Sequence, residues 1–221
     1  TSIVIGSNEQ TGDSTGGLFI EDDVSESSIS NLTMVIKAPV TANVGQNSSN
    51  YNFGLVASRI ISTSITNLTI DATEAAVSNS SLITIDASNN SSNNNDTTGS
   101  FAAGVVTGEL RQSSTISILQ VNGINFLTKS DIFTISGGKF ATYDIGTYFG
   151  RVVKGREDSE SSGGELDIRI NVGEISRSES ATTNSNQKIT LLGISSSSEV
   201  NVGGYIGNAQ SVNFFGSYRE N

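Results

Sequence analysis

The chain has 221 residues and a formal net charge of −10, from 12 basic and 22 acidic side chains. It contains no Cys, His or Trp, which excludes disulfides, thiolate or imidazole metal sites and every mechanism built on a catalytic His or Cys. The acidic balance argues against nucleic acid as a partner, and the apolar runs are too short to span a membrane, so we expect no membrane insertion.

Short β-branched segments follow one another along the chain and predict strands. Apolar and polar residues alternate within them, as in half-buried strands, and clusters of Gly, Asn, Asp and Ser between them predict turns. No long segment has the apolar spacing of a helix. The sequence therefore predicts an all-β protein, with strands in chain order at residues 1–5, 32–36, 68–70, 82–85, 116–119, 132–135, 166–170 and 189–192.

One unit recurs along these strands. A Gly-containing apolar segment is followed, after a polar turn, by a strand of the form Ser-Ile-Xaa-Asn-Leu-Thr. Gly17 and Gly54 of the first two units are 37 residues apart, and Asn31 and Asn67 are 36 residues apart. Weaker copies begin at residues 103, 149 and 203, and a third strand fits between units.

Repeats of this kind bury a continuous core only when they stack on one another. The sequence therefore predicts a parallel β-helix (β-solenoid) of about five irregular three-strand rungs, forming a single domain over residues 1–221. The spacing between units grows where polar stretches intervene, at residues 89–98, 156–164 and 176–187. We expect these stretches to be loops extruded from the solenoid.

The repeated unit resembles GLUG-type repeats. Gly16-Gly-Leu-Phe followed by Ser28-Ile-Ser-Asn-Leu-Thr carries the resemblance, and Gly203-Gly-Tyr-Ile-Gly207 through Ser211-Val-Asn213 is the closest match within the chain. The resemblance implies right-handed β-helix rungs in a large surface or secreted protein, often an adhesin. It implies an architecture and an extracellular or cell-surface location, and no catalytic site.

The ends of the predicted solenoid carry no recognisable cap, although an open rung exposes a strand edge. The chain opens directly on a predicted strand and stops shortly after Phe214 and Phe215. We expect it to be a segment of a longer chain or a protomer that stacks end to end, with its own copies or neighbouring domains as partners.

Two interpretations remain open for the Asn residues of the repeat. Asn31, Asn67 and Asn213 occupy equivalent places, which predicts an asparagine ladder at a solenoid turn, because Asn tolerates left-handed backbone and bonds locally. The other interpretation is N-glycosylation, which makes attached glycans part of the surface. Acceptor triplets begin at Asn31, Asn47, Asn67, Asn79, Asn89, Asn90 and Asn95.

The remaining polar residues predict no catalytic, cofactor-binding or metal-ligating site. The acidic clusters at residues 21–23 and 157–160 lack the loop patterns of calcium sites and are interpreted as solvated loops. Arg151, Lys154 and Arg156 form the only basic cluster, and Asp167 with Arg169 is interpreted as an exposed ion pair across rungs. The favoured hypothesis is a noncatalytic structural or adhesive extracellular module that forms filaments or fibres. The alternative is a carbohydrate-binding or carbohydrate-active β-helix protein.

Overall fold

The computed structural model describes residues 3–5, 14–46, 48–75, 81–90, 99–112, 118–154, 167–171 and 188–210. Within these ranges the chain forms nineteen strands and no helix, so the all-β prediction is confirmed. It follows that this part of the chain contains no helix that could cross a membrane.

All nineteen strands belong to four parallel sheets, here named A to D. Sheet A contains β1 (Ile3–Ile5), β5 (Val40–Asn43), β9 (Ile83–Ala87), β13 (Phe133–Gly137) and β17 (Ile189–Leu192). Sheet B contains β2 (Ser14–Gly17), β6 (Asn50–Gly54), β10 (Ser100–Ala103), β14 (Thr142–Gly146) and β18 (Glu199–Gly203). Sheet C contains β3 (Ile20–Ser25), β7 (Ala57–Ile61), β11 (Thr107–Gln112), β15 (Phe149–Lys154) and β19 (Ile206–Gln210). Sheet D contains β4 (Ser28–Val35), β8 (Ser64–Ala72), β12 (Ile118–Thr128) and β16 (Asp167–Asn171).

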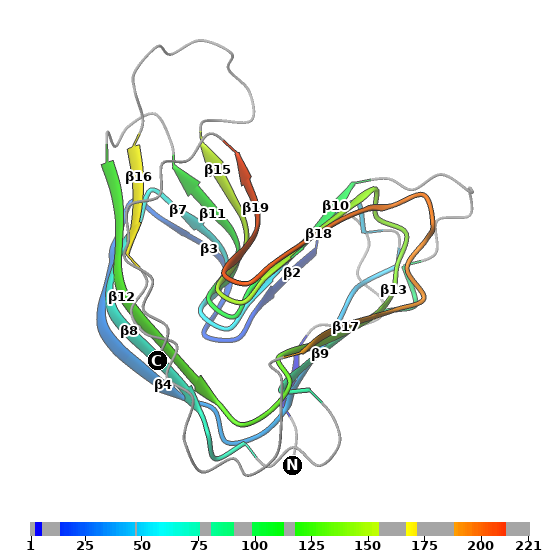
Figure 1. Cartoon of the computed structure of the whole chain (residues 1–221), viewed down its shortest axis with the longest axis horizontal. Coiled ribbons are helices and arrows are strands. Elements are labelled where there is room, and N and C mark those ends of the chain that lie inside the picture. The colour runs from blue at the N-terminus through cyan, green and yellow to red at the C-terminus, as the bar shows by residue number, and fades with distance from the viewer. Residues whose placement is uncertain are drawn as a thin grey trace.

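The chain visits the four sheets in turn and returns to the same sheet at every fourth strand (Figure 1). The prediction of three strands per unit was therefore wrong. The Gly-containing segment of each unit does not form one strand. It spans a bend between a strand of sheet B and a strand of sheet C, as at Leu55 and Val56 between β6 and β7. The sequence pattern predicts one strand where the structure has two, because apolar residues continue through the bend.

The core lies between the sheets and is built from side chains at the same register position on successive strands. Tyr51, Phe101 and Tyr143 align on β6, β10 and β14, and all three are buried. The ring centroids of Tyr51 and Phe101 lie 5.5 Å apart, and those of Phe101 and Tyr143 lie 5.2 Å apart. Each such pair adds about 0.5–1.5 kcal/mol beyond the burial of its area.

A sharp bend joins sheet B to sheet C and depends on a column of glycines. Gly17, Gly54, Gly104, Gly146 and Gly203 end the sheet B segment of each turn. A β-carbon at Gly54 would lie 2.4 Å from the carbonyl oxygen of Val106, and one at Gly146 would lie 2.2 Å from that of Phe149. Real β-carbons do not approach backbone atoms this closely, so only glycine fits where neighbouring turns meet.

The glycine column also corrects the phase of the predicted fourth unit. Alignment of the repeated units places Gly150 at the position of Gly54. In the structure, Gly150 lies one residue into β15, beyond the bend. A β-carbon there would lie 2.5 Å from the backbone nitrogen of Ala103 in sheet B. Gly108, Gly150 and Gly207 thus form a second column, which lets the backbone of sheet C lie directly against that of sheet B. The predicted loops fall outside the described residues, apart from Asn89 and Asn90.

Candidate functional site

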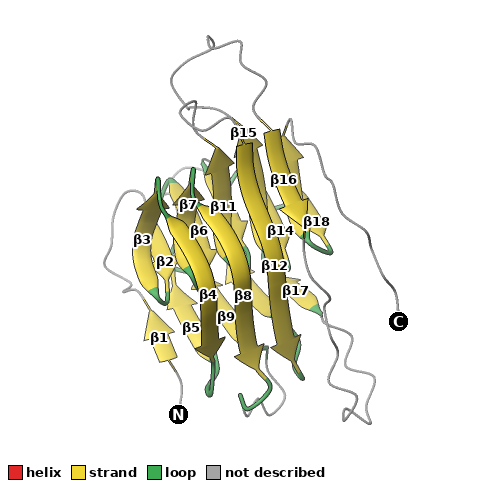
Figure 2. Ribbon diagram, turned by 90° about the vertical axis from the view of Figure 1, so that its left-hand side faces the viewer, coloured by secondary structure: helices red, strands yellow, loops and turns green. Residues whose placement is uncertain are grey.

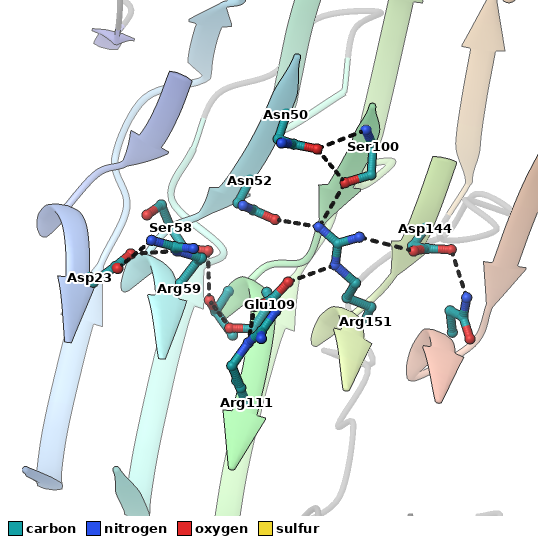
Figure 3. A network of polar contacts seen from close by, with 12 residues as sticks. Asp23, Asn50, Asn52, Ser58, Arg59, Ser100, Glu109, Arg111, Asp144 and Arg151 are labelled. Carbon is teal, nitrogen blue, oxygen red and sulfur yellow. Dashed lines mark hydrogen bonds and ion pairs between the residues drawn. The ribbon is translucent and has the colours of Figure 1, made fainter. Parts of the chain in front are cut away.

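A ladder of alternating charges runs across the outer face of sheet C (Figure 3). Asp23, Arg59, Glu109, Arg151 and Asn208 occupy one register position on β3, β7, β11, β15 and β19. They point away from the core, because the residues that follow them on β7, β11 and β15 are buried in it. Acidic and basic side chains therefore alternate from turn to turn until the ladder ends in an amide.

Arginine side chains join neighbouring turns along this ladder. Arg59 donates from Nε to Asp23 Oδ1 at 2.7 Å and forms a second bond to the other carboxylate oxygen. Arg151 Nε donates to Glu109 Oε2 at 2.8 Å, and Arg111 Nε donates to Glu109 Oε1 at 2.7 Å. Both oxygens of Glu109 therefore accept hydrogen bonds from guanidinium groups, which are the strong, charge-assisted kind.

Arg151 also connects sheet C to sheet B. Its Nη2 donates to Asn52 Oδ1 at 3.3 Å and to Ser100 Oγ at 3.0 Å, and its Nη1 lies 3.8 Å from Asp144 Oδ2. The other oxygen of Asp144 accepts bonds from the side-chain amides of Asn201 at 3.0 Å and of Asn208 at 3.1 Å. The outer faces of the two sheets are thus joined by one hydrogen-bonded network beside the glycine bend.

The two carboxylates at the centre of the network are buried although they lie outside the apolar core. Glu109 and Asp144 are each 2% exposed. Burial raises the pKa of Glu109, but the hydrogen bond from Arg111 and the charges of Arg151, Arg111 and Arg59 outweigh it, and the pKa lies below its usual range. A carboxylate with a lowered pKa that already accepts hydrogen bonds at both oxygens is a poor general base or nucleophile.

The depressed pKa of Glu109 predicts a pH-dependent contribution to stability. Its carboxylate stabilises the fold fully above the ordinary glutamate pKa of 4.5, and this contribution is lost as the pH falls through the lower pKa of the folded state. We expect the difference in free energy of unfolding between wild type and Glu109→Gln to be constant near neutral pH and to shrink below pH 4.5. Denaturant titrations across this range measure it, and a difference that grows on acidification would contradict the network.

Two members of the ladder belong to clusters that were noted in the sequence, Arg151 in the basic cluster and Asp23 in the acidic cluster at residues 21–23. The interpretation of residues 21–23 as a solvated loop was wrong, because they lie on β3 and Asp23 pairs with Arg59. The side chains of Lys154, Asp167 and Arg169 and the placement of Arg156 lie outside what the structure describes. Arg59, Glu109 and Arg111 were missed because they are far apart in the sequence and single charges are common on strands. For Arg59 and Glu109 the available signal was an equal offset from the glycine of each turn, since Arg59 follows Gly54 by five residues and Glu109 follows Gly104 by five.

The structure brings Asn31 and Asn67 together on sheet D. Both residues are exposed and have a φ of 53°, and Asn67 Nδ2 donates to Asn31 Oδ1 at 3.1 Å. Gly123, with a φ of 67°, follows at the same position on β12. The left-handed backbone at this position explains the choice of Asn and Gly. Asn213 lies outside the described residues.

The other acceptor triplets differ in accessibility. Asn89 is half-buried, whereas Asn90 is 4% exposed and donates from Nδ2 to the carbonyl oxygen of Ser48 at 3.2 Å. A glycan at Asn90 would break this bond and displace the chain around it. Asn47, Asn79 and Asn95 lie outside the described residues.

The left-handed position of Asn67 supports a prediction on stability. We expect Asn67→Ala to lower the free energy of unfolding by about 1–2 kcal/mol, since a β-carbon makes this backbone unfavourable for most residues. Asn67→Gly should cost less than Asn67→Ala, because glycine tolerates the backbone and only the bond to Asn31 is lost. Urea titration of the two variants measures the difference. Equal losses would show that the side-chain bond, and not the backbone, selects Asn.

Comparisons of the chain with protein-family models, with curated proteins and with solved structures find no match. Within the described ranges, no three acidic side chains lie close enough together to hold a metal ion. The geometry that bears on function is therefore the buried network, the Asn pair and the ends of the four sheets.

Proposed function

We propose that the chain is a parallel β-helix and that its role is structural or adhesive and noncatalytic, as a rigid module of an extracellular protein. One observation carries the proposal: four parallel sheets continue in register from turn to turn around one core. Each turn is bonded to the next along its backbone, and such stacks behave as quasi-one-dimensional rods. Stiffness along one axis is what a spacer or a fibre segment requires.

The polar network supports a structural role over the carbohydrate-active alternative. Hydrolysis of a glycosidic bond requires two accessible carboxyl groups with different protonation states. Glu109 and Asp144, the two buried carboxylates of the network, are 2% exposed and are held by Arg111, Arg151 and two Asn side chains. The largest aromatic side chains lie in the core, and Phe19, at 60% exposed, is the only aromatic among the strongly exposed apolar residues that the structure describes.

The extracellular location rests on the resemblance to GLUG-type repeats. The absence of Cys and the high content of Ser, Thr and Asn do not favour one cellular compartment over another. The Asn pair on sheet D adds an exposed, regular surface on which glycans or an adhesion partner can be placed.

The proposal is tested by joining electron microscopy with a ligand screen. We expect native protein at neutral pH to give narrow particles of uniform width, and to neither bind nor cleave the members of an oligosaccharide and polysaccharide panel. Asp144→Asn and Asn52→Ala serve as matched variants, because both alter the network without reaching the core. Saccharide binding or cleavage that disappears in these variants would overturn the structural proposal in favour of the carbohydrate alternative.

A further inference from the structure

Arg151 is bonded to two other turns of the stack at once. A full turn takes one strand from each sheet, so turns 1, 2, 3 and 4 begin at β2, β6, β10 and β14. Figure 2 shows β4, β8 and β12 of turns 1 to 3 side by side in that order. In such a stack each repeat normally contacts only its neighbours, and stability is a sum of nearest-neighbour contributions. The bond from Arg151 of turn 4 to Asn52 of turn 2 departs from this rule.

The small side chain of Ala102 in turn 3 lies on the path from Arg151 to turn 2. Asn52, Ala102 and Asp144 occupy one register position on β6, β10 and β14 of sheet B. Phe101 and Ala103 pack in the core, so Ala102 points to the opposite face of the sheet, toward sheet C. We attribute the reach of Arg151 to this residue, because a longer side chain on turn 3 would lie between Arg151 and Asn52.

One guanidinium group thereby holds three turns. Its Nη2 donates to Asn52 Oδ1 of turn 2 at 3.3 Å and to Ser100 Oγ of turn 3 at 3.0 Å (Figure 3). Its Nε donates to Glu109 Oε2 of turn 3 at 2.8 Å. The Arg151 side chain is 16% exposed, and hydrogen bonds from a charged group are stronger than those between neutral groups. Separate opening of turn 2, 3 or 4 therefore breaks at least one of these bonds.

The bonds at the two ends of the network join neighbouring turns, as the nearest-neighbour rule expects. Arg59 of turn 2 binds Asp23 of turn 1, and these side chains are 32% and 27% exposed. The side-chain amides of Asn201 and Asn208, which belong to turn 5, bind Asp144 of turn 4. These contacts add to single junctions between turns, whereas the contacts of Arg151 connect two successive junctions.

We propose that Arg151 is a strap that makes turns 2, 3 and 4 open as one cooperative unit instead of turn by turn. The inference rests on the proposed structural role and deepens it, because a strap across several turns stiffens a module that bears load. Turns that are coupled only to their neighbours can open locally, one after another. With the strap in place, this part of the stack stays closed until three turns open together.

Native-state hydrogen exchange of the full chain, followed by mass spectrometry at low urea concentrations, tests the strap. We expect the amides of β7, β11 and β15 to share one free energy of opening and one dependence on urea. Asn52→Ala removes only the bond to turn 2, since Arg151 keeps Ser100 and Glu109. Exchange in β7 should then become about tenfold faster or more, while β11 and β15 keep their rates.

Asn201→Ala is the matched control. Asn201 continues the register row of Asn52 and Asp144 on sheet B, but its bond to Asp144 joins neighbouring turns. We expect this variant to leave the exchange of β7, β11 and β15 equal. Independent exchange of these three strands in the wild type, or the same loss of protection in β7 for both Asn variants, would overturn the strap.

A double variant verifies that Asn52 acts through Arg151. Adding Asn52→Ala to Arg151→Met should leave the exchange of β7 unchanged, because the bond between the two residues is already absent. A further tenfold acceleration would show that Asn52 protects turn 2 by another contact, and would contradict the proposal.

Failure of this inference differs from failure of the proposed function. Turns that exchange independently would overturn the strap while leaving a noncatalytic rod. Saccharide binding or cleavage would overturn the structural role whether or not the three turns open together.

Discussion

Gly104→Ala is expected to lower the free energy of unfolding by about 3 kcal/mol or more, at the upper end of what overpacking costs. The added β-carbon would lie 2.4 Å from the carbonyl oxygen of Tyr148 and 2.5 Å from that of Thr107. Both are backbone atoms bonded into neighbouring turns, so neither can move without breaking the register of sheets B and C. The loss is a large part of the 5–15 kcal/mol that stabilises a typical domain.

Gly204→Ala is the matched control for this substitution. No atom lies within 4 Å of a β-carbon built at Gly204, so we expect its effect to stay within about 0.5 kcal/mol. Urea unfolding followed by far-ultraviolet circular dichroism gives both values. A small effect at Gly104 would mean that the bend relaxes to admit a side chain, and that the glycine column does not determine where sheet C begins.

The sequence predicted the all-β class and the turn-to-turn equivalence of Gly17 with Gly54 and of Asn31 with Asn67, because these depend on local pattern. Alternation of apolar residues reports which side of a strand is buried, and identical offsets report stacking. The number of strands in each turn was not predictable in the same way. Apolar residues such as Leu55 and Val56 continue through the glycine bend, so a bend between two strands has the same pattern as one longer strand.

The polar network was not predicted because its members come together only through the register of the sheets. Glu109 and Arg151 are 42 residues apart, and Asn52 and Arg151 are 99 apart. A charged residue at an outward position of a strand is usually solvated, and sequence alone does not reveal that sheets B and C bend toward each other there. Two glycine columns permit that bend, so the glycines and the network belong to the same feature of the fold.

Arg151→Met is expected to lower the free energy of unfolding by about 3 kcal/mol, because removal of one partner leaves buried charges uncompensated. The Arg151 side chain is 16% exposed and that of Glu109 is 3% exposed. The substitution removes the bonds to Glu109, Asn52 and Ser100 and the positive charge beside Asp144. Arg111 still holds one oxygen of Glu109, which keeps the loss below that of a fully unpaired carboxylate. Denaturant titration at neutral pH measures it.

Arg59→Met separates the effect of burial from that of pairing. Arg59 forms a bidentate pair with Asp23 on the same ladder, but the two side chains are 32% and 27% exposed. We expect this variant to lose about 1 kcal/mol or less, since solvent screens a half-exposed pair.

Adding Glu109→Gln to Arg151→Met should recover part of the lost free energy of unfolding, because the second substitution removes the negative charge that the first one left unpaired. Similar losses for both arginines, or no recovery in the double variant, would mean that the ladder is a solvated surface feature. Recovery would show that the alternation of charges along sheet C holds the turns in register against sheet B.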